Sequence, residues 1–292
     1  MTHQASLLRR TTAELVGTAA LLVVVIGSGI QADALSRDTG VALVANSLVS
    51  AIGLGLIITL FGPLSGAHLN PVVTLTTWWA RRSGRDGLAG REALAYAAAQ
   101  ITGAIGGAVL AEAMFGRTPG TLATQVRDDG HLLIGEVVAT AGLVLVIEGL
   151  GRLGRAKLIP VAVAAYLAAA IWFTSSGSFA NPAGTVGRAF SDSFTGIAPQ
   201  SLPGFVAAQL LGGALGLGLA TLLYGRAGRT GAPEIALVGV QGGGRDDDVV
   251  QGGAPDRAQR GARDGDQGAP AADGEDPVAD IPRTGPTYEA AV

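Results

Sequence analysis

The sequence predicts an all-α integral membrane protein with six transmembrane helices and two shorter re-entrant half-helices. Three observations predict this fold class. Of the 292 residues 48% are hydrophobic and only 15% are charged, a composition unusual for a water-soluble domain. Six apolar segments each approach the roughly 20 residues that a helix needs to cross the hydrocarbon core of a bilayer. The two halves of the chain also share a sequence pattern, which indicates an internal repeat.

The six predicted spans lie at about residues 12–30, 41–61, 93–115, 131–151, 157–176 and 204–225. The 45 glycines suit helices that pack closely through small side chains, because lipid provides no hydrophobic force to drive helices together. We expect the first span to stay in the protein rather than to be cleaved as a signal peptide, since further spans follow it. The chain has no cysteine, which excludes disulfides, thiolate metal sites and thiol catalysis.

Basic residues between the spans predict the orientation. They accumulate before span one, between spans two and three, between spans four and five, and after span six, and these segments all face one side of the membrane. Cytoplasmic loops carry the excess of Lys and Arg, so we expect a multi-pass protein of the cell membrane with both termini in the cytoplasm. The residues concerned are Arg9, Arg10, Arg81, Arg82, Arg85, Arg91, Arg152, Arg155, Lys157, Arg226 and Arg229.

The domain organisation follows from a change in composition near Gly231. We expect a membrane domain over 1–230, with one repeat at about 12–115 and the other at about 131–225. Residues 231–292 are acidic, rich in Gly, Pro and Asp, and nearly free of large apolar groups, so we predict a disordered tail. Regulation or partner binding by this tail is the alternative. The net charge of −3 gives no footprint for nucleic acid binding.

The internal repeat is visible in three pairs of segments. AELVGTAALLVVVI parallels GEVVATAGLVLVIE, so that Glu14 matches Glu136, and AQITGAIGGAVLA parallels AQLLGGALGLGLA, so that Gln100 matches Gln209. GAHLNPVVT and GSFANPAGT share Gly, Asn, Pro and Thr in register. Each copy contains three spans, and an odd number means that the second copy enters from the opposite face. The sequence therefore predicts an inverted 3+3 repeat whose related sites meet near the membrane midplane.

The segments NPVVTLTTWWA and NPAGTVGRAF are too short to span but long enough for half-helices. Asn70 and Asn181 suit the N-cap position, and Pro71 and Pro182 suit the first helical position. Irregular backbone at this depth is tolerated where it lines water, so we expect both asparagine amides to donate into an aqueous pore. Two facing positive helix ends oppose cations and protons, which indicates passage of neutral solutes.

Paired Asn-Pro boxes on an inverted repeat resemble the major intrinsic protein family of aquaporins and aquaglyceroporins, over about residues 12–225. The resemblance, to a bacterial member, implies a right-handed bundle with a pore in every protomer and a homotetramer in the lipid bilayer. It implies passive passage of small uncharged solutes: water, glycerol-like polyols, urea, ammonia or neutral metalloid acids such as arsenous acid. It also implies that His68 lines the pore rather than packing as a loop histidine, and that Glu14 and Glu136 are buried structural carboxylates. The two pore boxes consist of Asn70, Pro71 and Val72 and of Asn181, Pro182 and Ala183.

The resemblance implies a variant selectivity filter. The family's spacing places the filter at positions that are all small and uncharged here, namely Ser50, Ala169, Ser178 and Gly184. Gly184 stands where most members carry an arginine that narrows the outer pore, so we expect a wide filter. Arg188 lies one helical turn beyond Gly184 and can reach back toward the pore mouth. Pairing of Arg188 with Asp192 or with water is the alternative.

Two other functions remain open beside a channel. A proton-coupled secondary transporter also shows inverted repeats and broken helices, and Glu14, Glu136 and Glu148 would be its proton relays. The paired boxes favour a channel, and we expect Glu148 to form an interfacial i,i+4 pair with Arg152. The second alternative is a channel-fold protein with a structural or sensing role. The sequence holds no metal-ligand cluster and no phosphate loop in context, so we expect no enzyme activity, metal or cofactor. We expect Gln100 and Gln209 at helix-packing positions.

Overall fold

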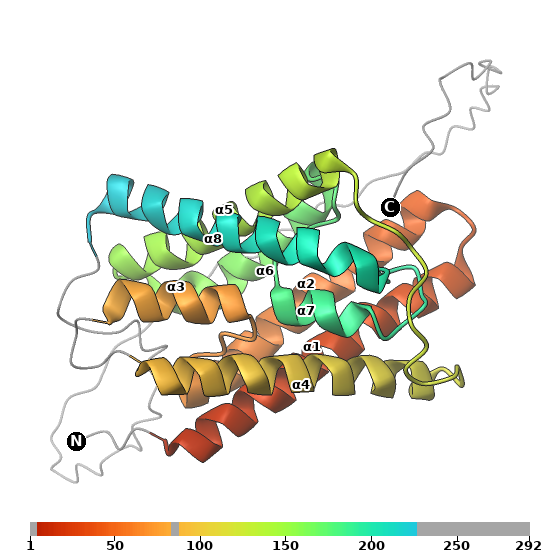
Figure 1. The fold of residues 1–292 in the computed structure, drawn as a ribbon, viewed down its shortest axis with the longest axis horizontal. Helices are drawn as coiled ribbons and strands as arrows, with labels where there is room; N and C mark the ends of the chain where they lie inside the picture. Colours follow the sequence, from red (N-terminus) through yellow and green to blue (C-terminus); the bar gives the residue numbers. More distant parts are fainter. Residues whose placement is uncertain (1–4, 83–87, 227–292) are drawn as a thin grey trace, which may run out of the picture. The chain divides into compact units, whose positions relative to one another are not determined.

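The computed structural model describes residues 5–82 and 88–226, and the regular structure in these ranges is helical (Figure 1). The segment 231–292, for which we predict a disordered tail, lies outside the described residues. Six helices are long and two are short. They are α1 (Leu7–Leu35), α2 (Thr39–Ser65), α3 (Pro71–Arg81), α4 (Gly90–Met114), α5 (Gly130–Arg152), α6 (Ile159–Phe173), α7 (Pro182–Arg188) and α8 (Leu202–Tyr224), with 3-10 turns η1 (Ala156–Leu158) and η2 (Pro199–Ser201).

The prediction of six spans is confirmed, because six helical segments in the described ranges are long and apolar enough to cross a membrane. The first helix is longer than the apolar segment that predicted it. It continues through Arg9 and Arg10 at one end and through Gln31 at the other. These residues form helix readily but fall outside an apolar window, because hydropathy measures what lipid accepts rather than where a helix ends.

The two half-helices begin as the Asn-Pro boxes predict. The Asn70 side chain accepts a hydrogen bond from Val72 N at 2.9 Å, and Pro71 occupies the first turn of α3. The Asn181 side chain accepts from the backbone N–H groups of Ala183 and Gly184 at the start of α7. Each asparagine has an extended backbone, which turns the preceding loop sharply into the helix. The box residues therefore fix where both half-helices start.

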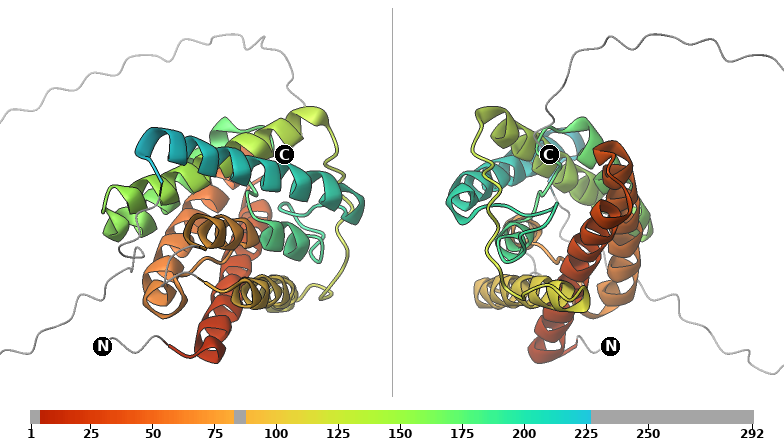
Figure 2. Two further views of the ribbon diagram at one scale, coloured as in Figure 1. Left: turned by 60° about the vertical axis from the view of Figure 1, so that its left-hand side comes forward. Right: turned by 90° about the vertical axis from the view of Figure 1, so that its right-hand side faces the viewer.

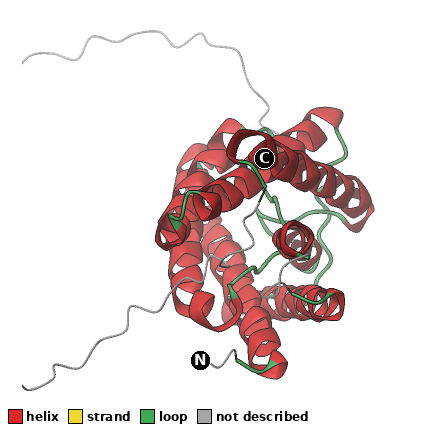
Figure 3. Cartoon of the chain, turned by 90° about the vertical axis from the view of Figure 1, so that its left-hand side faces the viewer, coloured by secondary structure: helices red, strands yellow, loops and turns green. Residues whose placement is uncertain are grey.

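The half-helices α3 and α7 lie between α5 and α8 on one side and α4 on the other (Figures 1 and 2). Figure 3 shows a helix end on near the middle of the bundle, with other helices around it and loops running toward it. The long helices thus hold the two boxes inside the bundle.

Glycines allow the long helices of each half to approach closely. A Cβ on Gly103 of α4 would lie 2.2 Å from the carbonyl oxygen of Leu15 in α1. At Gly107, Gly212 and Gly216 the nearest backbone oxygen of the facing helix would lie 2.3 to 2.5 Å from such a Cβ. No Cβ tolerates these distances, so only glycine permits the backbone contact between α1 and α4 and the equivalent contact between α5 and α8.

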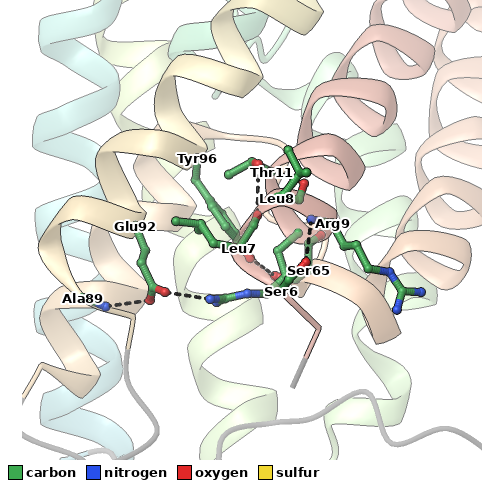
Figure 4. Close-up of polar contacts among 10 residues, drawn as sticks. Ser6, Leu7, Leu8, Arg9, Thr11, Ser65, Ala89, Glu92 and Tyr96 are labelled. Atoms are coloured by element: carbon green, nitrogen blue, oxygen red, sulfur yellow. Dashed lines mark hydrogen bonds and ion pairs between the residues drawn. The ribbon is translucent and has the colours of Figure 1, made fainter. Parts of the chain in front are cut away.

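Polar contacts fasten the beginning of α1 to the beginning of α4 (Figure 4). The Glu92 carboxylate accepts from the Ala89 N–H at 3.0 Å and pairs with the Arg10 guanidinium at 2.7 Å. Deeper in the bundle, the Tyr96 hydroxyl donates to the Ser65 carbonyl at 2.9 Å. Glu92 thereby caps its own helix and ties it to the first helix at the same end.

The outer surface of the bundle is apolar. On α2 one stripe at i, i+4 spacing consists of large side chains that are more than half exposed: Leu48, Ile52, Leu56 and Leu60. A stripe of this kind is stable against lipid or another protein and costly against water. The bundle therefore has apolar side chains both in its core and on its outer surface, as an integral membrane protein does.

Candidate functional site

The two Asn-Pro boxes are joined by a reciprocal pair of hydrogen bonds. Asn70 Nδ2 donates to the Ala180 carbonyl at 2.7 Å, and Asn181 Nδ2 donates to the Leu69 carbonyl at 2.8 Å. These bonds connect positions 110 and 112 residues apart. A side-chain amide has two N–H groups, so one N–H of each asparagine is used for the junction and the other remains as a donor beside it.

The loops before the boxes have an unusual backbone that repeats in both halves. Ala67 and Leu69 have positive φ angles of 46° and 52°, and the equivalent Ser178 and Ala180 have 52° and 48°. Non-glycine residues rarely adopt this left-handed conformation, which costs on the order of 1–3 kcal/mol each. Such a backbone persists only where its surroundings determine it, and in this site the determining groups are two buried glutamates.

Glu14 of α1 holds the first loop. Its Oε1 accepts from His68 N at 3.0 Å and from Ser65 Oγ at 2.6 Å. Its Oε2 accepts from Leu69 N at 2.7 Å and from Gln100 Nε2 at 2.8 Å. The side chain is completely buried. Four donors satisfy the carboxylate, which makes its burial tolerable and fixes the loop from inside the bundle.

Glu136 of α5 holds the second loop in the same way. It accepts from Phe179 N and Ala180 N, both at 2.8 Å, and from Gln209 Nε2 at 2.6 Å. It is also completely buried. The two glutamates therefore occupy equivalent places in the two halves, each facing a loop that precedes a box.

Gln100 and Gln209 have a more specific part than the helix packing that we expected. Besides donating to the glutamates, their Nε2 atoms donate to the hydroxyls of Thr74 and Thr185, at 2.9 and 2.8 Å. The prediction of a packing role was incomplete because the motif comparison considered the spacing of the neighbouring glycines. A polar residue at equivalent positions of two apolar spans was the signal that could have shown the bonded network.

His68 lies in the first loop, two residues before Asn70. Its Nδ1 is 3.1 Å from Thr74 Oγ1, and its ring packs edge-on to Tyr96 with centroids 5.5 Å apart. Phe179 takes the equivalent place in the second half and packs edge-on to Phe205 at 5.2 Å. The packed neighbours of His68 do not exclude a pore-lining role, which stays a prediction.

The four predicted filter positions differ in exposure. Ser50, Ser178 and Gly184 are buried, whereas Ala169 is exposed on α6. Within the described part of the chain, the buried hydroxyls of Ser50 and Ser178 have no hydrogen-bond partner. The three heavy atoms nearest to a Cβ at Gly184 would belong to the Asn181 side chain, at 3.4 to 3.6 Å. Ser178 and Gly184 thus lie within three residues of Asn181 in the sequence, whereas the membership of Ser50 in the filter stays a prediction. The membership of Ala169 in the filter stays a prediction.

Arg188 does not pair with Asp192. Its guanidinium carbon lies 3.8 Å from the centroid of the Phe179 ring. Asp192 Oδ1 instead accepts from the backbone and hydroxyl of Thr124, at 2.9 and 3.0 Å. The predicted alternative, a pair between Arg188 and Asp192, is therefore wrong, because Thr124 in the connection between α4 and α5 binds the Asp192 carboxylate.

A second arginine near Phe179 was not anticipated from the sequence. Arg127, in the connection between α4 and α5, has its guanidinium carbon 5.3 Å from the same ring and is only 4% exposed. Burial lowers the pKa of Arg127 to about 10, while the charge of Glu136 acts in the opposite direction. The sequence gives no signal for this contact, because it depends on how a connection folds back across the bundle.

The expected Glu148–Arg152 pair is present, with Arg152 Nη2 at 3.3 Å from Glu148 Oε2. The two side chains are 3% and 6% exposed, so the pair is buried among neighbouring helices, and its position at the membrane interface stays a prediction. A helix end can be buried by its neighbours even where its sequence suggests the membrane surface. In the described ranges, no group of three or more His, Cys, Asp or Glu residues is placed to hold a metal ion.

Comparisons with known proteins agree with this geometry. Residues 1–155 match the model of the family described as Major intrinsic protein. The chain is 46% identical to the aquaglyceroporin AqpS of Rhizobium meliloti, over 73% of this chain and 89% of that protein. It is 32% identical to aquaporin NIP1-3 of Oryza sativa subsp. japonica, over 62% of this chain and 63% of that protein.

Among solved structures, the fold resembles the X-ray structure of the aquaglyceroporin from Plasmodium falciparum. The TM-score is 0.54 at 20% identity, and the match covers 75% of this chain and 96% of that chain. The family match spans half of the chain, and the AqpS match spans nearly all of a relative at high identity. The chain belongs to the major intrinsic protein family, whose members are multi-pass membrane channels for water and glycerol-like small neutral solutes and are not enzymes.

Proposed function

We propose that this protein is a wide, passive channel for neutral hydroxylated or amide solutes of about the size of glycerol, including glycerol-like polyols, urea and trihydroxy metalloid acids, besides water. The observation that carries the proposal is the bare backbone of Gly184 in the first turn of α7, directly after the second box. The name aquaglyceroporin, borne by a relative that is 46% identical, supports the same solute class.

The two boxes supply the orienting donors of this channel. Asn70 and Asn181 are bonded to the opposite loops through one N–H each, so the second N–H of each amide is held in a fixed direction. The N-termini of α3 and α7 start at these residues and carry partial positive charge. A neutral solute oxygen accepts from the amides, whereas a cation meets two positive helix ends.

The filter residues Ser50, Ala169, Ser178 and Gly184 set the width. None has a side chain larger than a hydroxymethyl group. The buried hydroxyls of Ser50 and Ser178, which have no partner within the described residues, both donate and accept. They can form hydrogen bonds to solutes that carry several hydroxyl or amide groups, which a channel for water alone does not require.

Passive transport follows from the state of the buried carboxylates. A proton relay needs a group that gains and loses its proton during the cycle. Glu14 accepts four hydrogen bonds and Glu136 accepts three. Each is thereby committed to holding a loop. Glu148 is paired with Arg152. These contacts favour a channel over the proton-coupled transporter.

In the membrane, we place both termini in the cytoplasm and four copies in the assembly. The excess of basic residues on one side of the six spans supports the orientation. The exposed leucine and isoleucine side chains of α2 and α8 support burial against lipid and neighbouring copies. Each copy contains both boxes, so every protomer has its own pore.

Stopped-flow light scattering on vesicles that contain the purified protein tests the proposal. Water, glycerol, urea and arsenous acid are presented one at a time, with empty vesicles as the control. We expect flux of the larger solutes along their gradients, unchanged by a protonophore. Accumulation against a gradient that a protonophore abolishes would replace the channel by a transporter. No flux of any solute from correctly inserted protein would favour a structural or sensing role.

A further inference from the structure

Two positively charged arginine side chains lie against the ring of Phe179. The guanidinium carbon of Arg188 is 3.8 Å from the ring centroid and that of Arg127 is 5.3 Å from it. A guanidinium within about 6 Å of an aromatic centroid is attracted by the negative face of the ring. Two guanidiniums on one ring also repel one another, so this arrangement needs further support from the surrounding chain.

The support for Arg127 comes from the loops on both sides. Its Nε donates to the Gly196 carbonyl at 3.0 Å, its Nη2 to Gln125 Oε1 at 2.9 Å, and its backbone N–H to Ser201 Oγ at 2.9 Å. The Ala198 N–H donates to the Gln125 carbonyl at 2.6 Å, which ties the two loops together. Arg127 is therefore held rigidly, although it lies in a connection between helices.

The charge of the pair is not neutralised by an ion pair. In residues 5–82 and 88–226, neither Arg127 nor Arg188 has a carboxylate oxygen within 4.0 Å. Glu136 is bonded to the Phe179 backbone, and its oxygens accept from Phe179 N, Ala180 N and Gln209 Nε2 rather than from either arginine. Even with the pKa of Arg127 lowered to about 10 by burial, this guanidinium is protonated at neutral pH.

The pair stands next to the proposed filter. Arg188 is four residues after Gly184 on α7, and residues at this spacing share a helix face. Phe179, the platform of both arginines, directly follows Ser178 in the second loop. Because α7 starts at the junction of the boxes and runs away from it, Arg188 lies further out along the pore than Gly184.

We propose that Arg127 and Arg188, supported by the shared ring of Phe179, form the cation barrier at the outer entrance of this channel. The inference rests on the pore and filter described under Proposed function. It assigns the positive charge that position 184 lacks to one residue a helical turn further out and to one residue of the α4–α5 connection. Size selection and charge selection are then separate, so a wide filter still excludes cations.

The sharpest test compares urea with guanidinium, two planar solutes of nearly equal size of which only guanidinium is charged. Uptake of each radiolabelled solute into vesicles is measured, with the membrane potential held at zero by potassium and valinomycin. The variants are Arg127→Gln, Arg188→Gln and the double variant, with Arg127→Lys and Arg188→Lys as charge-conserving partners. Arg155→Ala is the matched control, because Arg155 is exposed and lies outside the entrance.

In the double Gln variant, we expect the guanidinium-to-urea permeability ratio to rise on the order of tenfold, because a fixed charge at an entrance walled by protein of low dielectric constant acts more strongly than in bulk water. The Lys variants and Arg155→Ala should keep the ratio of the unmodified protein. Raising the salt concentration from 20 mM to 500 mM, which shortens the screening length to a few ångströms, should raise the ratio in the unmodified protein but not in the double Gln variant.

Three outcomes separate the possibilities. An unchanged ratio in a double Gln variant that conducts urea normally would overturn the cation barrier and leave the channel intact. Equal loss of urea and water flux in the Gln and Lys variants would mean that the arginines only stabilise the loops, which also overturns it. Absence of urea and glycerol flux in the unmodified protein would instead refute the proposed function.

Discussion

His68 of the first half and Phe179 of the second half occupy equivalent positions, two residues before the asparagines of their boxes. Each has its backbone N–H bonded to a buried glutamate and its ring packed edge-on against an aromatic side chain of the facing helix. The two halves of the inverted repeat therefore share the backbone bond and the ring packing at this position, but differ in the chemical type of the ring. The ring of the first half lies within hydrogen-bond distance of a threonine hydroxyl, and the ring of the second half attracts cationic side chains.

This equivalence predicts that His68→Phe folds and assembles, because the second half shows that the same surroundings accept a phenyl ring. The bond between the imidazole and Thr74 is lost, and with it a polar group beside the first box. We expect flux of glycerol and urea to fall a few-fold, with a smaller effect on thermal stability. Stopped-flow scattering, normalised to the amount of inserted protein, measures the flux. Flux equal to that of the unmodified protein would place His68 outside the pore.

Gly184→Arg should narrow the proposed wide filter. The backbone has room for the new Cβ, whose nearest neighbours are atoms of Asn181 at 3.4 Å and beyond. We expect glycerol and arsenous acid permeability to fall on the order of tenfold and water permeability to fall much less, because a long side chain occludes area before it stops single-file water. The fraction of assembled protein is measured in the same preparation. An unchanged glycerol-to-water ratio in assembled protein would show that Gly184 is not a filter residue.

Two neighbouring glycines of α4 provide a matched test of helix packing. A Cβ at Gly107 would lie 2.3 Å from the Ala19 carbonyl oxygen, whereas a Cβ at Gly106 has no heavy atom within 4 Å. We expect Gly107→Ala to force α1 and α4 apart and to lower the melting temperature strongly. Gly106→Ala should be neutral or stabilising, by up to about 1 kcal/mol, since alanine favours helix over glycine. Thermal unfolding in detergent checks both, and equal melting temperatures would contradict the close backbone contact.

Gln209→Leu tests the support of the second loop. The substitution removes one of the three donors of Glu136 and leaves a buried carboxylate oxygen with less compensation, which costs about 1–3 kcal/mol. We expect a lower melting temperature and less protein of full size in gel filtration. Gln31→Leu, at an exposed position near the end of α1, serves as the control for the same change of residue type. If both variants have the same melting temperature as the unmodified protein, the bond between Gln209 and Glu136 contributes nothing measurable to stability.

Truncation near Gly231 should leave assembly and flux intact. The segment that follows has few of the large apolar side chains that a membrane bundle buries. Unit permeability per inserted protein is compared for the full and the shortened chain. A large loss of flux at equal insertion would mean that the tail takes part in gating.

The sequence predicted the fold well because lipid imposes strong constraints on it. Six apolar segments and two Asn-Pro boxes predict where helices cross and where half-helices start, since each depends on local chemistry. Glu14 and Glu136 also stood out as carboxylates at equivalent places in apolar spans. Their partners Gln100 and Gln209 were assigned only to packing, because glycine spacing dominated the comparison of those helices.

Other features depended on tertiary contacts that local patterns do not contain. The carboxylate of Asp192, four residues from Arg188, suggested an ion pair, but Thr124 of a distant loop binds it instead. Arg127 lies between a valine and two aspartates, a composition typical of an exposed connection. Its burial follows from bonds to Gly196 and Ser201, which lie 69 and 74 positions later in the chain. No sequence motif predicts these bonds.

The reciprocal bonds between the boxes also affect how the protein is made. Asn70 is synthesised 110 residues before Ala180, the acceptor of its amide. Until the second half is inserted, the amide of Asn70 and the carbonyl of Leu69 lack their final partners at a depth where lipid offers none. The first half therefore remains an unfinished insertion intermediate. We therefore expect the two re-entrant loops to reach their final bonding together, in a late step of biogenesis that follows insertion of the second loop.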